Sequence, residues 1–252
     1  PLGEGLGFVK TSPVGPMTGH FLDQATATGN ADFRFKLTVP LVGNQHPQVQ
    51  GSVTLAGNDV FLNPDIPRLA RARAVVGFTE SGVTVTGGQV RALGGEARIE
   101  GGLYFAALPG TAPPKGVPTV LRINGTATGE GLRAARELGG VARLGQYATG
   151  TTTYNAQVGL RQGIPEVSVQ SNLVGVALRL PPPLAKPAEQ ALPLRLETRA
   201  IPGPGPAALE QIHLEVDRIA AVTYVRDLAA TPPSVVRGAI GLGLAADESA
   251  PL

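Results

Sequence analysis

The chain has 252 residues, of which 34 are Gly and 23 are Pro, while 42% are hydrophobic and 16% are charged. This balance excludes an intrinsically disordered chain, and the many Gly and Pro residues imply frequent turns. No Cys is present, which excludes a disulfide scaffold, a zinc ribbon and a thiol nucleophile. The net charge of +2 and the aromatic content of 4% argue against nucleic acid as a partner.

The chain lacks a long apolar run. No segment reaches the ~18 consecutive apolar residues that a membrane helix needs. The first residue is Pro1 and the only methionine is Met17. We therefore expect residues 1–252 to be one fragment of a longer protein, with any membrane anchor upstream of it.

The first strong pattern is a strict alternation of apolar and polar residues at 31–39, which is typical of a strand with one apolar face. Its apolar members are Ala31, Phe33, Phe35, Leu37 and Val39. Residues 48–55 repeat the pattern. Alternation, in places imperfect, returns at 71–78, 82–85, 96–104, 149–161, 192–199, 211–217 and 235–244. Nearly the whole chain is therefore predicted to be strand and turn.

Short Gly-containing segments separate these runs, at 43–44, 57–59, 87–88, 94–95 and 101–102. Such segments favour β-hairpin turns, so successive strands should pair antiparallel. The Asn-Gly pair at 124–125 is predicted to be another tight turn. Parallel pairing would need a helix of ten or more residues between strands, and the sequence shows only one helical pattern.

That helix is predicted around residues 130–144. Its apolar positions are Leu132, Ala135, Leu138 and Ala142, which recur at helical spacing. The Gly pair at 139–140 is the candidate break within it. The Pro-rich stretch at 108–118 is the candidate boundary between two subdomains. Because alternation resumes after it in the same style, we favour one continuous sheet.

A strand with one apolar face must have that face covered by another sheet, a helix or a ligand. A closed β-sandwich is one solution. The other is a sheet curled into an open trough whose apolar lining contacts acyl chains. In a trough, small inner-face residues would leave room for the chains, and the candidates are Gly51, Ala72, Ala74 and Ala97.

Signatures of catalysis are missing from the sequence. The histidines His20, His46 and His213 lie far apart, so a metal site would have to be assembled by the fold, and an enzyme would need a polar pocket around His46 or His213. No G-x-S-x-G, H-E-x-x-H or P-loop pattern occurs. Two G-x-G-x-x-A matches, at 129–134 and 241–246, lack the acidic residue and the βαβ unit of a dinucleotide site. We expect no catalytic residue, no metal and no cofactor.

From residue 167 onward the sequence VSVQSNLVGVALRLPPPLAKPAEQALPLRL resembles the AsmA-like family of Gram-negative envelope proteins. The shared pattern is S-[DN]-L-x-G, then L-P-x-P-L-x-K, then a Pro-Leu pair. The matched positions are Ser171, Asn172, Leu173, Gly175, Leu180, Pro181, Pro183, Leu184, Lys186, Ala188, Pro193 and Leu194. Residues 19–40, 49–53, 76–82 and 150–154 are similar to the same family, less specifically.

The resemblance implies a periplasmic part of a protein that an upstream helix anchors in the inner membrane, with outer-membrane contact through other parts. Such proteins are similar to bridge-like lipid carriers, in which a curled β-sheet forms a hydrophobic groove for phospholipids moving between the two membranes. The resemblance carries over no catalytic residue, and we interpret the 180–184 run as a turn into the next strand. The alternative is a structural or adhesive closed β-sandwich or solenoid without lipid cargo.

Pattern and resemblance together predict an all-β, mainly antiparallel fold, in which a long curled β-sheet forms an open hydrophobic groove. The residues expected to line the groove are Phe33, Phe35, Leu37, Val39, Val53, Leu55, Val76, Phe78, Val158, Leu160, Leu194, Leu196, Leu214 and Val216.

Overall fold

The computed structural model describes residues 1–11, 22, 24–38, 48–63, 66–79, 81–105, 118–138, 140–161, 164–201, 209–230 and 233–243. The elements of the first half are α1 (Leu2–Thr11), β1 (Thr26–Ala27), β2 (Ala31–Thr38), β3 (Gln48–Phe61), β4 (Leu69–Thr79), β5 (Gly82–Ala92), β6 (Gly94–Tyr104) and β7 (Val120–Thr128). A short helical insert follows, formed by α3 (Gly129–Ala134), the 3-10 turn η1 (Arg136–Leu138), α4 (Gly140–Leu144) and the 3-10 turn η2 (Gly145–Tyr147). The second half contains β8 (Ala148–Arg161), β9 (Ile164–Ser171), β10 (Val176–Leu178), β11 (Leu194–Ile201), β12 (Leu209–Val216), β13 (Ala220–Asp227) and β14 (Ser234–Leu242).

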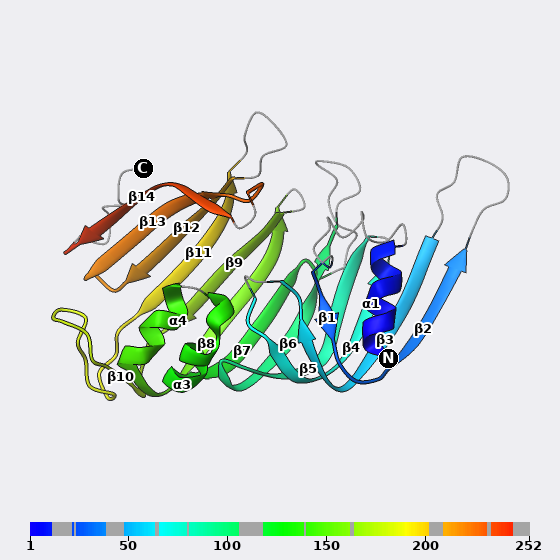
Figure 1. Ribbon diagram of the computed structural model, residues 1–252, viewed down its shortest axis with the longest axis horizontal. Coiled ribbons are helices and arrows are strands. Elements are labelled where there is room, and N and C mark those ends of the chain that lie inside the picture. The colour runs from blue at the N-terminus through cyan, green and yellow to red at the C-terminus, as the bar shows by residue number, and fades with distance from the viewer. Residues whose placement is uncertain are drawn as a thin grey trace.

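The strands form one antiparallel, 14-stranded sheet that does not close on itself. Its main path follows chain order from β3 to β9 and then from β11 to β14, while β1 and β2 both pair with β3, and β10 pairs with β8. Figure 1 shows the strands side by side along the long axis, with β2 at one end, β14 at the other and the helices in front of the sheet. The predicted all-β, open, antiparallel architecture is confirmed.

The cross-strand register gives the sheet one apolar face. Residues directly opposite each other in neighbouring strands share a face. One row of such opposite residues runs through Phe33, Val53, Val76, Val85, Gly101, Leu121, Val158 and Val167. A second row runs through Ala156, Val169, Leu196, Leu214, Val222 and Ile240. Ala156 lies two positions from Val158, so both rows belong to the same side, which we call the apolar face.

Several predicted turns are wrong, because their glycines lie inside strands. The segment 57–59 belongs to β3 and 87–88 to β5, and the register shifts at both places as it does at a β-bulge. Gly57 and Gly87 have φ of +118° and +64°, values that favour glycine. The Gly pair at 101–102 lies within β6, and Asn124 lies within β7 opposite Asn155. Only the pair at 94–95 begins a strand after a tight turn, while 43–44 lies outside the described residues.

The predicted helix at 130–144 is a set of short turns, α3, η1, α4 and η2, interrupted near the Gly pair as its sequence indicated. Thr128 begins α3, and its Oγ1 accepts a hydrogen bond from the Gly131 N–H at 2.8 Å. The prediction of a single helix is wrong, since α1 is a second one. The sequence did not predict α1 because positions 3, 5 and 7 are Gly, which is a poor helix former.

A small core lies where the strands β3 to β7 pack against one another on the apolar face. Ala72, Val90 and Ala97 are at most 4% exposed, and they contact half-buried apolar residues, which are Leu55, Val60, Leu69, Ile99 and Ile123. Residues 106–117, which include most of the candidate boundary at 108–118, lie outside the described residues. The sheet continues across this interval, since β6 pairs with β7.

Candidate functional site: an apolar groove

The predicted lining residues lie on the same face of the sheet. In register, Phe35 and Gly51 oppose each other, Gly51 opposes Phe78, and Leu55 opposes Ala31. Leu160 opposes Pro165 on β9, and Leu194 opposes Val216 on β12. With the two rows given above and with Leu37, which opposes Val49, these pairs place thirteen of the fourteen residues on the apolar face. The fourteenth, Val39, lies outside the described residues.

Sequence patterns missed several strands that contribute to this face. β7, β9 and β13 add residues between those predicted, namely Leu121, Ile123, Val167, Val169, Val222 and Tyr224. The residues on β7 and β9 alternate with polar neighbours, but over only four or five residues, and a search for such short alternations beside a recognised strand would have found them. On β13 the apolar residues Ala221 and Val225 flank the pair and hide the alternation.

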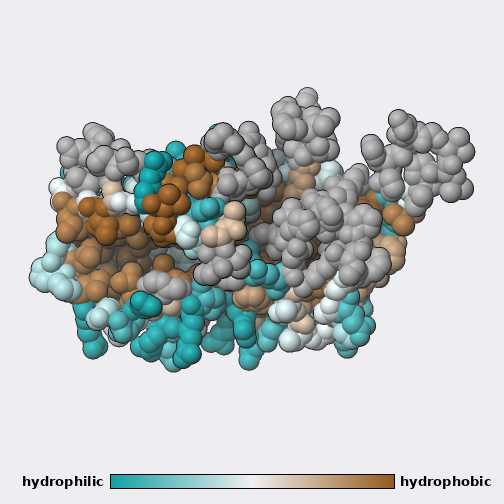
Figure 2. Space-filling model, turned by 45° about the horizontal axis from the view of Figure 1, so that its top comes forward, coloured by the Kyte–Doolittle hydropathy of each residue, from teal (hydrophilic) through white to brown (hydrophobic). Residues whose placement is uncertain are grey.

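The apolar face lines an open hollow. Figure 2 shows apolar side chains gathered in this hollow, clearest over β8 to β14, with hydrophilic side chains below it. Among the described residues, the most exposed large apolar side chains lie at the two edge strands. Phe35 and Leu37 on β2 are 69% and 58% exposed, and Ile240 and Leu242 on β14 are 74% and 70% exposed. The sheet therefore presents a groove rather than a sealed interior.

The prediction that small residues leave room for acyl chains is wrong for Ala72 and Ala97, because both are buried in the core described above. The space beside Gly51 is likewise filled by the protein itself and not left for a ligand. A Cβ at this position would meet the Phe78 ring and lie 2.7 Å from the Arg34 carbonyl oxygen. The small residues allow the sheet to curl and aromatic rings to pack, and the larger side chains form the surface of the groove.

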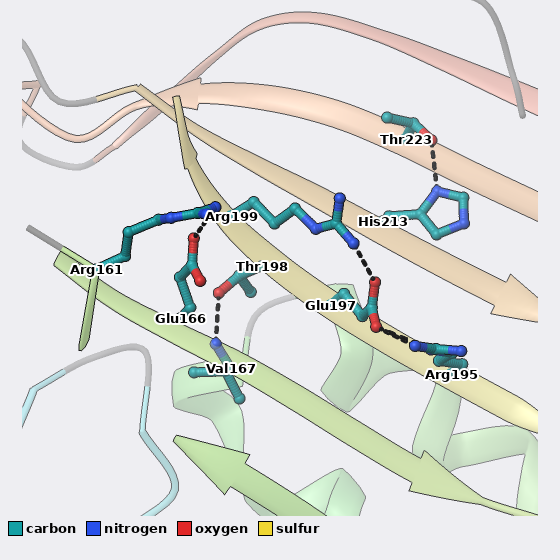
Figure 3. Close-up of polar contacts among 9 residues, drawn as sticks. All are labelled: Arg161, Glu166, Val167, Arg195, Glu197, Thr198, Arg199, His213 and Thr223. Atoms are coloured by element: carbon teal, nitrogen blue, oxygen red, sulfur yellow. Dashed lines mark hydrogen bonds and ion pairs between the residues drawn. The ribbon is translucent and has the colours of Figure 1, made fainter. Parts of the chain in front are cut away.

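The opposite face of the sheet is polar. Figure 3 shows ion pairs there on β8, β9 and β11. Glu197 lies between Arg195 and Arg199, with oxygen to nitrogen distances of 2.5 and 3.3 Å, and Arg161 lies 3.6 Å from Glu166. Burial raises the pKa of Glu197, but the Arg195 hydrogen bond and the charges of Arg195, Arg199 and His213 outweigh it, so the net pKa is lowered. We call this side the polar face.

One ion pair lies on the apolar face. Glu210 and Arg226 oppose each other close to the ends of β12 and β13, and their side chains are 2.5 Å apart and 8% and 19% exposed. Farther along the same face, burial raises the pKa of the Tyr154 hydroxyl. Both observations indicate surroundings from which water is largely excluded.

The motif at 171–194 forms a folded segment at the side of the sheet. Ser171 Oγ donates to the Thr153 carbonyl at 2.7 Å, and the Leu184 N–H bonds to the Pro181 carbonyl, so the 180–184 run is a turn. Lys186 is 5% exposed, and its Nζ donates to the Val176 and Pro187 carbonyls. Burial lowers the pKa of Lys186, which Glu189 partly opposes. Lys186 thereby fastens its own segment to β10, which itself pairs with β8.

The candidate histidines form no site in the part of the chain that the structure describes. His213 lies on the polar face, where its Nδ1 is 2.8 Å from Thr223 Oγ1 (Figure 3). His20 and His46 lie outside the described residues. No group of three or more potential metal ligands occurs among those described, and none of the described helices is both long and apolar enough to cross a bilayer.

An open antiparallel sheet with one continuous apolar face and one polar face defines a groove-forming β-protein, suited to an elongated apolar ligand. Comparison with known families is consistent with this class. Residues 1–251 match the YhdP protein family, and the chain belongs to it. This is a family of AsmA-like lipid-transport proteins and not an enzyme family. Neither the curated proteins nor the solved structures contain a match to the chain.

Proposed function

We propose that this chain is a segment of a bridge-like carrier that shields phospholipid acyl chains as they move between the inner and outer membranes of the Gram-negative envelope. The observation that supports it best is the continuous row of apolar residues across the sheet. The proposal places the chain in the periplasm, within a protein that another segment anchors in the inner membrane. No catalytic step is part of it.

The physical basis is the cost of exposing acyl chains to water, about 0.8 kcal/mol for each CH2 group. Twelve strands from β2 to β14, leaving out β1 and β10, lie side by side in the sheet. At a spacing of about 4.8 Å, they extend the apolar face over about 50 Å. This exceeds the ~30 Å hydrocarbon core of a whole bilayer. A lipid can therefore keep apolar contact while it changes position, without one deep binding site.

Site-specific photo-crosslinking in cells tests the proposal. The probe is placed at Phe35 and Phe78 on the apolar face, and at Arg34 and Lys36 on the polar face as matched controls. We expect radiolabelled phospholipid on the purified protein only for the first pair. Label at neither position, or equal label on both faces, contradicts lipid carriage and favours the structural or adhesive alternative.

A further inference from the structure

Helix α1 lies on the apolar face at the β2 end of the sheet. Its Gly5 backbone packs against the Phe33 ring, which occupies the space where a Cβ of Gly5 would be. Leu2, at the start of the helix, is 5% exposed, and its N–H donates to the Gly29 carbonyl at 2.9 Å. Phe33 is 41% exposed, whereas Phe35, two positions further along β2, is 69% exposed. The helix therefore covers part of the surface proposed to hold acyl chains.

The helix has little stability of its own. It is ten residues long, below the length at which isolated helices persist in water. Three of those residues are Gly, the weakest helix former after Pro. Close packing against Phe33 explains why residue 5 is glycine. Gly7 has no such explanation, because a Cβ there would meet no described atom within 4 Å. Contacts with the Phe33 ring and with the backbone around β1, rather than helix propensity, hold α1 in place.

We propose that α1 is an exchangeable lid, which covers the apolar face at Phe33, the residue opposite Val53, when that site is empty and leaves it when an acyl chain arrives. The inference rests on the proposed function. Helix and acyl chain compete for one surface because both bind it through apolar contact. Since α1 is intrinsically weak, a lipid can displace it without unfolding the sheet.

Three single substitutions in the full-length protein test the lid. Gly5→Asp puts a carboxylate against Phe33 and should undock α1, whichever way the ring turns. Gly7→Asp adds the same charge where a side chain meets open space, and is the matched control. Gly7→Ala should favour the helix about four- to five-fold, the difference in helix propensity between the two residues. The readout is phospholipid crosslinked to a probe at Val53, opposite Phe33, and at the remote position Val158.

We expect Gly5→Asp to raise the label at Val53 several-fold, Gly7→Ala to lower it about four- to five-fold, and Gly7→Asp to leave it near the unmodified level. Label at Val158 should stay constant in all three. If Val158 is labelled and Val53 does not respond, the lid is wrong and the lipid carrier stands. If both positions change together, the effect is not local and the lid is wrong. If neither position is labelled in any variant, lipid carriage itself is wrong.

Discussion

Glu197 shows how single residues stabilise the polar face. Its carboxylate accepts two hydrogen bonds from Arg195 and one from Arg199. Arg195 lies two positions before Glu197 on the same strand, and Arg199 lies two positions after it. These side chains leave the same side of β11, so strand geometry alone brings the charges together. Because Glu197 is only 19% exposed, water screens these interactions less than it does for a fully exposed pair.

The lowered pKa of Glu197 makes its contribution to stability depend on pH. A carboxyl group whose folded pKa lies below its usual 4.5 stabilises the fold above that pH, and the benefit disappears as pH falls through the folded pKa. We expect Glu197→Gln to lower the free energy of unfolding by about 1 kcal/mol at pH 7, and by much less near pH 3. Urea denaturation at both pH values measures this. Glu96→Gln, an exposed carboxylate on β6, is the control, and an equal loss at both pH values for Glu197→Gln would contradict the prediction.

At the scale of strands, Gly125 and Gly159 show that glycines in one sheet have different roles. A Cβ on Gly125 in β7 would lie 2.8 Å from the Ala97 Cβ and 2.8 Å from the Tyr154 ring. A Cβ on Gly159 in β8 would meet only the Thr119 carbonyl oxygen, at 4.0 Å. Gly125 therefore allows β6, β7 and β8 to curl around Tyr154, and Gly159 has no comparable packing reason.

Alanine at the two positions should accordingly act in opposite ways. Gly125→Ala overpacks the apolar face and should cost about 1–3 kcal/mol. Gly159→Ala should be neutral or stabilise by about 0.5 kcal/mol, because it reduces the freedom of the unfolded chain. Thermal unfolding of the two variants under one condition measures the difference. Equal behaviour would show that the curvature at β7 does not depend on Gly125.

Sequence alternation predicted the strands whose two faces differ sharply. β2 is the clearest case, because Phe33, Phe35 and Leu37 alternate with charged or polar residues without exception. The pattern failed at Gly87, where a bulge adds a residue and changes the period within one strand. It also failed at Asn124. Asn favours turns, but this residue lies within β7 and is paired with β6 on one side and β8 on the other. Pairing with neighbouring strands overrides local preference there, and no local pattern contains that information.

The candidate groove was predictable to a similar extent. The face of each recognised strand followed from period two, so the lining residues fell on one side. What the sequence could not supply was the curvature, because Ala72 and Ala97 are as compatible with a groove surface as with a core. The cover that α1 provides was also hidden, since a helix with three glycines forms only where a partner surface holds it.

At the scale of the whole molecule, the groove is one path, and a single charge in its middle should interrupt it. Val158 lies on the apolar face of the central strand β8, and its neighbour Gln157 is exposed on the polar face. Probes at Phe35 and at Leu214 lie on the two sides of Val158 along the groove. We expect Val158→Asp to lower crosslinked phospholipid about ten-fold or more at one of these two probes, because an ionised carboxylate is costly in apolar surroundings.

Gln157→Asp is the matched control for this experiment, since it adds the same charge to the polar face of the same strand. It should leave the label at both probes unchanged. The side on which Val158→Asp lowers the label also identifies the direction from which lipid enters. Unchanged label on both sides would show that lipid does not travel past β8.

The near identity of chain order and strand order has a consequence for how the molecule forms. From β3 to β9 each strand pairs with the strand made just before it, so a strand finds its partner in the neighbouring element of the chain. Closing the short connection between two such strands costs little conformational entropy. The sheet can therefore grow from its first hairpins during synthesis, before the later strands exist. A misfolded strand would stop that growth locally and leave the earlier strands paired.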